Sequence, residues 1–201
     1  MRALKLPHLP RPIVLASASP RRSDLLKRIV DDFDVVPSDA VERIAPDCAP
    51  AEAAKANARA KAEAVARGFK RGTIIGADTI VAAADGGIVG KPTDRADARA
   101  ILTRLAGSRH CVITGVCVID AASSRTDCRA EATWVTMRAM SAAEIEDYVA
   151  SGEADGKAGA YAIQETGDRF VVKVEGSMSN VIGLPVELLE KMLQEWNPDE
   201  E

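Results

Sequence analysis

The sequence has few aromatic residues and no excess of positive charge. Aromatic residues make up 3% of the 201 residues, and the formal net charge is −4. A protein that binds nucleic acid over a broad surface needs a basic face, and binding of single strands also needs rings for base stacking. We therefore expect no nucleic-acid partner, and any phosphate binding must depend on a small local group of residues.

The pattern of metal-binding residues is also sparse. The four cysteines form no Cys-x-x-Cys pair, and the two histidines, His8 and His110, lie far apart in the chain. A structural zinc site is therefore not expected. Cys111, Cys117 and Cys128 lie in or beside apolar, strand-like runs, which predicts buried thiols that act as small hydrophobic residues.

Targeting signals are missing as well. Residues 1–11 contain prolines and charges where a secretory signal has an apolar stretch, and no apolar run approaches the length of a membrane span. We expect a reducing, cytoplasmic setting and no membrane partner. The length and the 47% hydrophobic fraction suit one α/β domain over residues 13–196, between an extension at 1–12 and a tail at 197–201.

Strand-like and helix-like segments alternate along this domain. Strands are expected at residues 12–16, 33–37, 73–84, 88–89, 111–119, 130–137 and 169–174. Helices are expected at residues 20–30, 51–68, 94–105 and 141–152, and from residue 185. Turns near residues 85–86 and 121–125 interrupt the alternation with hairpins, so the pattern predicts an α/β fold with a mixed sheet.

The segment Leu-Ala-Ser-Ala-Ser-Pro-Arg-Arg, residues 15–22, passes from a strand through small residues into a helix. Ser19 suits the N-cap and Pro20 the first helical position. Arg21 and Arg22 follow in the first turn, where the partial positive charge of a helix N-terminus disfavours cations. A bound phosphate would account for both arginines, although a capped helix with two solvated arginines fits this segment equally well.

Asp78 interrupts an otherwise apolar run at residues 73–81. A buried, unpaired carboxylate is energetically costly, so such a residue usually has a metal, a cationic partner or a catalytic task. Gly76 and Ala77 before it leave room for a ligand close to the backbone. The alternative is an aspartate at a strand end that faces water.

Other polar residues are weaker signals when each is taken alone. Glu42 lies in a loop, Lys61 in an alanine-rich helix, Lys91 after a hairpin and Gln164 at the end of an apolar segment. Each is more often a solvated side chain than a functional one. Residues 180–185, with a glycine and an asparagine ahead of a helix, suit either close approach to a ligand or a plain helix entry.

Taken together and in this order, the segments closely resemble the Maf family of nucleoside triphosphate pyrophosphatases. The resemblance runs from about Ile13 to Leu193, and the ordered set is specific although each piece alone is weak. The matching pieces are residues 15–22, Asp39, Glu42, Lys61-Ala62, Gly76-Ala77-Asp78-Thr79, Gly90-Lys91-Pro92, residues 157–164, Gly176-Ser177 and residues 180–185.

The resemblance implies a two-lobed α/β fold like that of the inosine triphosphatase-type enzymes, with the active cleft between the lobes. It implies hydrolysis of a nucleoside triphosphate to the monophosphate and pyrophosphate, with a divalent cation such as Mg²⁺ or Mn²⁺, and a homodimer. The family was first named for an effect on septum formation. A nucleotide-binding regulator of cell division without turnover is therefore the alternative function.

The resemblance also implies roles for single residues. Arg22, Lys61 and Lys91 would contact the triphosphate, with Ser17 beside them. Asp78 would be the general base that takes a proton from water. Glu42, together with Asp78, would hold the metal, since magnesium prefers one or two carboxylates plus substrate oxygens.

Three further positions, Arg21, Thr79 and Gln164, resemble the family members that act on dTTP and UTP. A glutamine offers both a donor and an acceptor to the imide edge of a pyrimidine, whereas a carboxylate would repel the carbonyl groups of the base. The chain departs from this type nearby. Glu165 stands where a glycine is usual, and Met178 where an aromatic residue is common.

Overall fold

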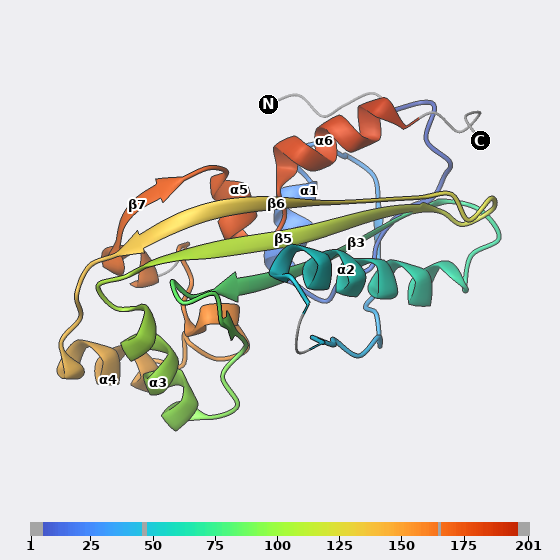
Figure 1. Ribbon diagram of the computed structural model, residues 1–201. Helices are drawn as coiled ribbons and strands as arrows, with labels where there is room; N and C mark the ends of the chain where they lie inside the picture. Colours follow the sequence, from blue (N-terminus) through green and yellow to red (C-terminus); the bar gives the residue numbers. More distant parts are fainter. Residues whose placement is uncertain (1–5, 46–47, 165, 197–201) are drawn as a thin grey trace.

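The computed structural model describes residues 6–45, 48–164 and 166–196, and these residues form a seven-stranded sheet with helices on both faces (Figure 1). The strands are β1 Ile13–Leu15, β2 Asp34–Val35, β3 Thr73–Ala82, β4 Ile88–Val89, β5 Arg109–Asp120, β6 Thr126–Met137 and β7 Val171–Glu175. The helices are α1 Pro20–Leu26, α2 Pro50–Ala66, α3 Arg95–Leu105, α4 Ala142–Ala150, α5 Met178–Ile182 and α6 Val186–Glu195. Two 3₁₀ turns, η1 Ala158–Ala160 and η2 Thr166–Phe170, precede β7.

The sheet is mixed, as the sequence predicts. Its order is β2-β1-β3-β5-β6-β7, and β4 pairs with β3 beside this path. β1 runs parallel to β2 and β3, whereas the pairs β3–β5, β5–β6 and β6–β7 are antiparallel. The α/β assignment is therefore confirmed.

Alanines and two glycines let α2 pack very close to the sheet. A Cβ atom at Gly76 on β3 would lie 2.2 Å from the carbonyl oxygen of Ala58, and one at Gly115 on β5 would lie 2.3 Å from that of Ala54. Any larger side chain at these two positions would push the helix away. The alanine-rich sequence of α2 is thus explained by its close contact with β3 and β5.

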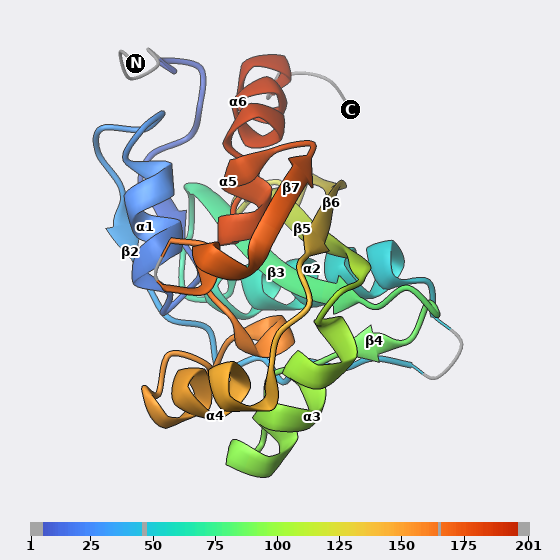
Figure 2. The ribbon, with the colours of Figure 1, turned by 90° about the vertical axis from the view of Figure 1, so that its left-hand side faces the viewer.

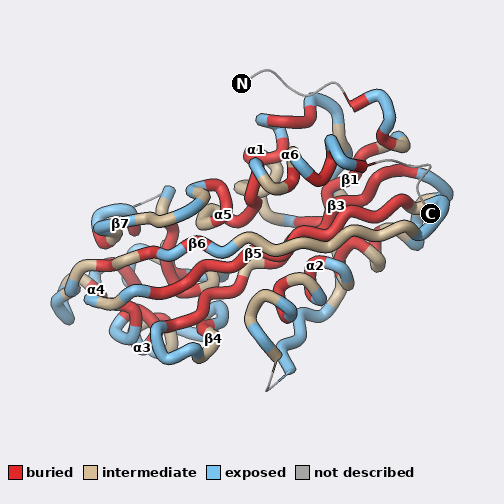
Figure 3. The backbone as a smooth tube through the Cα atoms, turned by 45° about the horizontal axis from the view of Figure 1, so that its top comes forward, coloured by how far each residue is buried: buried red, intermediate tan, exposed pale blue. Residues whose placement is uncertain are grey.

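The buried hydrophobic residues described form four clusters, and the two largest lie at different places along the sheet. One joins β1, α1 and α6 to the sheet, and the other joins α3 and α4 to it. Figure 2 shows α1 and α6 well separated from α3 and α4, and Figure 3 shows buried backbone continuing along β3 and β5 between them. We call the two parts the α1/α6 lobe and the α3/α4 lobe; the expected two-lobed arrangement is confirmed.

Some predicted boundaries are wrong. α1 ends at Leu26, although apolar residues continue to Val30, and β2 contains only two exposed residues. Strands β5 and β6 extend further toward their turn than the apolar runs do, because backbone pairing continues through polar positions. None of the described helices has the length and apolar character needed to cross a membrane.

The expectation of buried thiols fails for one pair of cysteines. Cys117 and Cys128 lie directly opposite each other in the β5–β6 register and form a disulfide. Cross-strand register brings the two sulfur atoms together, and the spacing of the cysteines along the chain does not reveal it. Cys111 is a buried free thiol, as expected.

Candidate active site

The site lies where the outer edge of β3 is open. β1 pairs with residues 73–75 of β3, and β4 pairs with Val81 and Ala82. Within the described part of the chain, no strand pairs with this edge between those two segments. Successive side chains of a strand point to opposite faces, so Asp78 faces α2 and Thr79 faces α1. At the open edge both residues line one pocket.

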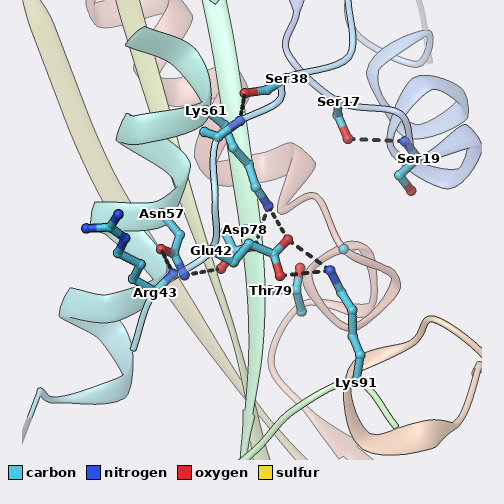
Figure 4. A network of polar contacts seen from close by, with 12 residues as sticks. Ser17, Ser19, Ser38, Glu42, Arg43, Asn57, Lys61, Asp78, Thr79 and Lys91 are labelled. Carbon is cyan, nitrogen blue, oxygen red and sulfur yellow. Dashed lines mark hydrogen bonds and ion pairs between the residues drawn. The ribbon is translucent and has the colours of Figure 1, made fainter. Parts of the chain in front are cut away.

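A network of ionic contacts surrounds Asp78 (Figure 4). Its carboxylate lies 2.6 Å from Lys61 Nζ and accepts a hydrogen bond of 3.0 Å from Asn57 Nδ2. Lys61 Nζ also lies 2.7 Å from Glu42 Oε1. Asp78 is only 4% exposed, so the alternative of an aspartate that faces water is wrong. A cationic partner compensates its buried charge.

Glu42 joins the two lysines of the site. Lys91 Nζ lies 2.9 Å from both carboxylate oxygens of Glu42, which also contacts Lys61. Burial alone would raise the pKa of Glu42, but the hydrogen bonds and charges of Lys61 and Lys91 outweigh it and lower this pKa to about 2. Glu42 is therefore ionised at neutral pH.

Asn57 is a site residue that the sequence reasoning missed. It lies one helical turn before Lys61 on α2, so both side chains reach Asp78 from the same helix face. Its Oδ1 accepts a hydrogen bond of 2.9 Å from the backbone N–H of Arg43, which ties the loop of Glu42 to α2. A lone amide on an alanine-rich helix face, four residues before a lysine, was the available signal.

Arg22 is held from three sides. Its Nε donates to the carbonyl oxygen of Gly183 at 2.9 Å, Nη1 to Ser17 Oγ at 3.3 Å and Nη2 to Thr79 Oγ1 at 3.1 Å. Burial lowers the pKa of Arg22, whereas the charges of Asp78 and Glu42 oppose this shift. The guanidinium is thus fixed at the pocket wall by neutral acceptors.

The loop before α1 differs in one detail from the prediction. Ser19 occupies the N-cap position, but its side chain makes no capping hydrogen bond. Instead the backbone N–H of Ser19 donates to Ser17 Oγ at 3.2 Å. The Ser17 hydroxyl therefore connects the loop to Arg22.

The pocket lies between the two lobes. On one side are Ser19, Arg21 and Arg22 before and within α1, and on the other is the segment 156–164 of the α3/α4 lobe. Of the predicted site residues, the pocket is lined by Arg21, Arg22, Asp78, Thr79, Lys91 and Gln164. Ser17, Glu42 and Lys61 join them through the hydrogen bonds described above. The structure therefore brings all the predicted site residues together.

Part of the pocket wall is apolar. Val81, Val112, Ile163, Val181 and Ile182 line the pocket together with Gln164, and we call this group the apolar end. Shape and a few polar groups determine what fits against such a surface.

Two buried hydroxyls anchor the segment that carries Gln164. Tyr161 Oη lies 2.8 Å from His110 Nε2, and the backbone N–H of Ala162 donates to Tyr148 Oη at 3.1 Å. Burial lowers the pKa of His110 to about 4 and raises that of Tyr161. Both groups are neutral at pH 7, so an uncharged hydrogen bond anchors this end.

The two carboxylates suit a metal ion only if the substrate completes its shell. The described residues contain no group of three or more His, Cys, Asp or Glu that could hold a metal alone. Glu42 and Asp78, however, both contact the single nitrogen Lys61 Nζ, so their oxygens face a common point. Magnesium bound by one or two carboxylates together with phosphate oxygens and water fits such a donor set.

The fold and the site together define a class: a two-lobed α/β protein whose interlobe pocket sets cationic side chains around a buried carboxylate. Residues 12–196 match the family model described as Maf-like protein, and the chain belongs to the Maf family. A dTTP/UTP pyrophosphatase of Syntrophomonas wolfei is 46% identical over 179 residues, covering 89% of this chain and 94% of the relative. Proteins of the same name from Ruminiclostridium cellulolyticum and Salinibacter ruber are 44% and 46% identical, over 93% and 91% of this chain and 97% and 90% of their own lengths.

Proposed function

We propose that this protein hydrolyses dTTP and UTP to the nucleoside monophosphate and pyrophosphate. One observation carries the proposal: Asp78 is buried at the wall of a pocket that also contains Arg22 and Lys91. The relatives named dTTP/UTP pyrophosphatases, which match nearly the whole chain, support the choice of substrate.

The cationic end of the pocket suits a triphosphate. Arg22 uses three of its five N–H groups on protein acceptors, which leaves two for phosphate oxygens. Lys61 and Lys91 both contact Glu42, and their ammonium groups can bind phosphate oxygens as well. Fixed positive groups stabilise the charge that develops on the leaving pyrophosphate.

Asp78 is the proposed general base. Water attacks the α-phosphorus, the bond from that phosphorus to the bridging oxygen breaks, and pyrophosphate leaves with the electron pair of that bond. Asp78 accepts the proton of the attacking water. Lys61 and Asn57 hold the carboxylate in place on both of its oxygens.

Glu42 and Asp78 are the residues proposed to hold a divalent cation such as Mg²⁺ or Mn²⁺. When bound, the ion would supply charge neutralisation on the phosphates and a more acidic water. The lowered pKa of Glu42 supports this role, because a metal ligand must be deprotonated.

The apolar end is proposed to bind the base. The side-chain amide of Gln164 can pair with the imide edge of thymine or uracil, whose ring would lie against the valine and isoleucine side chains described above. Arg21 lines the same pocket and is proposed to help distinguish one base from another.

We also propose that the protein is a cytoplasmic homodimer that binds neither membranes nor nucleic acid. The net charge of −4 supports the absence of a nucleic-acid partner. Sedimentation equilibrium of the purified protein should give the mass of two chains, and a single-chain mass would contradict the dimer.

The test is pyrophosphate release from dTTP and UTP in the presence of Mg²⁺. Asp78→Asn should lower kcat by about 10²- to 10⁴-fold, the usual contribution of a general base. Asp120→Asn is the matched control. Asp120 is also a buried aspartate on the sheet, but its carboxylate accepts hydrogen bonds from Ala122 and Ser123 at the β5–β6 turn and does not line the pocket. Tight nucleotide binding by calorimetry with no product would instead support the regulator without turnover.

A further inference from the structure

A chain of hydroxyl groups leads from Arg22 and Thr79 at the pocket wall into the interior of the protein. Thr79 Oγ1 accepts a hydrogen bond from Arg22 and lies 3.0 Å from Thr114 Oγ1, its direct partner in the β3–β5 register. Thr114 in turn donates to the backbone carbonyl of Asn180 at 3.2 Å. Thr114 and Asn180 are fully buried, and neither lines the pocket.

The direction of this chain follows from the number of protons. Each threonine hydroxyl has one proton to donate. Because Thr114 gives its proton to Asn180, the hydroxyl of Thr79 must donate to Thr114, and its oxygen is left to accept from Arg22. Hydrogen bonds that run in one direction polarise and strengthen one another.

Helix α5 closes the chain into a ring. Asn180 Nδ2 donates to the carbonyl of Val112 at 3.0 Å and to Thr133 Oγ1 at 2.9 Å, which fastens α5 to β5 and β6. Helix α5 ends at Ile182, and Gly183 caps it with a φ of +128° that favours glycine. The Gly183 carbonyl accepts a hydrogen bond from Arg22 Nε. Arg22 is thus connected to α5 twice, once directly and once through the two threonines.

We propose that Thr114 is a positioning residue for catalysis: through Thr79 it orients the Arg22 guanidinium so that its two unused N–H groups meet the triphosphate. This inference rests on the proposed function. It also gives Thr79 a definite task. With its proton committed to Thr114, Thr79 acts through Arg22 and does not donate a hydrogen bond to a carbonyl of the base.

Three variants test this role. Thr114→Val removes the hydroxyl but keeps the shape, and Thr114→Ser keeps the hydroxyl. Thr73→Val is the matched control, because Thr73 is also a fully buried threonine of the sheet, and its hydroxyl donates to the carbonyl of Pro10 at 2.8 Å, apart from the pocket. For each variant, kcat and KM with dTTP and the inhibition constant of inorganic pyrophosphate are measured.

In Thr114→Val, the Thr79 side chain is free to rotate, so it no longer holds the Arg22 guanidinium in one orientation. We therefore expect kcat/KM to fall about ten-fold and inhibition by pyrophosphate to weaken by a similar factor. Thr114→Ser should stay close to wild type, and Thr73→Val should keep full activity. Should Thr114→Val not fold, Thr114→Ala is compared with Thr73→Ala in the same assays.

Two results would overturn the positioning role: equal activities in the Thr114 and Thr73 variants, or an equal loss in Thr114→Ser and Thr114→Val. The failure of the proposed function is distinguishable, because the wild-type protein would then release no pyrophosphate from dTTP or UTP. If the wild type is active and Thr114→Val has the same kcat/KM and the same pyrophosphate inhibition, only the positioning role is contradicted.

Discussion

The two ends of the pocket are built in different ways. The phosphate end consists of ionic contacts among side chains from four separate segments, which carry Glu42, Lys61, Asp78 and Lys91. The base end consists of apolar side chains and one segment, residues 156–164, which buried neutral hydroxyls hold in place. At the phosphate end, a charged ligand can replace one partner of an ion pair. At the base end, the shape of the pocket is fixed before the ligand binds.

This difference explains which residues can exchange partners. Lys61 and Lys91 share Glu42 as an acceptor, so a phosphate group can take over a lysine contact without leaving a buried charge unpaired. Tyr161 and His110, by contrast, do not exchange their hydrogen bond for one to a base, because both side chains are buried and hydrogen-bonded to each other. The phosphate end provides charge neutralisation, and the base end provides discrimination.

Loss of the Lys61 charge should have the largest effect. Lys61→Met leaves Asp78 without its cationic partner and is expected to lower kcat/KM for dTTP by about 10³-fold. Lys55→Met, on the same helix but paired with the exposed Glu52, is the control and should stay active. Steady-state kinetics of both variants decide the matter, and similar losses in the two would contradict a special role for Lys61.

A negative charge at the base end should come next. Gln164→Glu places a carboxylate against the carbonyl groups of thymine or uracil and should reduce kcat/KM for dTTP and UTP by about 10²-fold. Inhibition by inorganic pyrophosphate should not change, because that ligand occupies only the phosphate end. A parallel change in both measurements would show that the two ends are not separate.

Titration of one residue at each end should lower the stability of the protein, and the two losses should occur at different pH values. Burial lowers the pKa of His110 from its ordinary value of 6.5 to about 4. The unfolded chain therefore binds a proton that the folded protein does not, so the free energy of unfolding should fall by at most about 3 kcal/mol as the pH drops from 6.5 to 4. Glu42, with a pKa of about 2 instead of 4.5, adds a later loss as the pH falls from 4.5 to 2.

Urea unfolding at pH 7, 5.5 and 4.5 measures the first of these losses. His110→Gln removes the titrating group and should flatten the dependence between pH 6.5 and 4.5. If the wild type and this variant lose stability in parallel over that range, the decrease has another source. Glu42 is partly exposed, so we expect its own contribution to be small in solution.

The smallest expected effect comes from the anchor of the base end. Tyr161→Phe removes the hydroxyl and leaves His110 Nε2 without its partner, which should cost about 1–2 kcal/mol of stability. We expect KM for dTTP to rise a few-fold while kcat is kept, because the phosphate end is untouched. Thermal unfolding and steady-state kinetics check both values, and a drop in kcat alone would contradict the separation of the two ends.

Two residues of the site stand out along the chain because they occupy unusual local positions. Asp78 interrupts an apolar strand, and Arg22 follows a helix N-terminus that disfavours cations, so each conflicts with its surroundings. Asn57, Thr114 and Asn180 conflict with nothing nearby. An amide in a helix or a threonine in a strand is ordinary, and its task depends on what lies across the sheet.

The disulfide shows the same limit. Cys117 and Cys128 are separated by 11 positions, which is compatible with many arrangements of the intervening chain. Only the β5–β6 register makes them direct neighbours. A shift of the register by one residue would place the two side chains on opposite faces of the sheet.

The sequence by itself determined the alternation of strands and helices, the α/β class and the unusual positions of Asp78 and Arg22. These follow from local preferences, from hydrophobic periodicity and from residues that conflict with their neighbours along the chain. Glu42, Lys61 and Lys91 were found only through the family resemblance. The tertiary structure alone decided that β3 has an open edge, where side chains from both faces of the strand meet. It also decided that a hydroxyl from β3, a hydroxyl from β5 and a backbone carbonyl from α5 form one chain of hydrogen bonds to Arg22. Both depend on pairing between segments far apart in the chain, and periodicity within a segment carries no information about its partner.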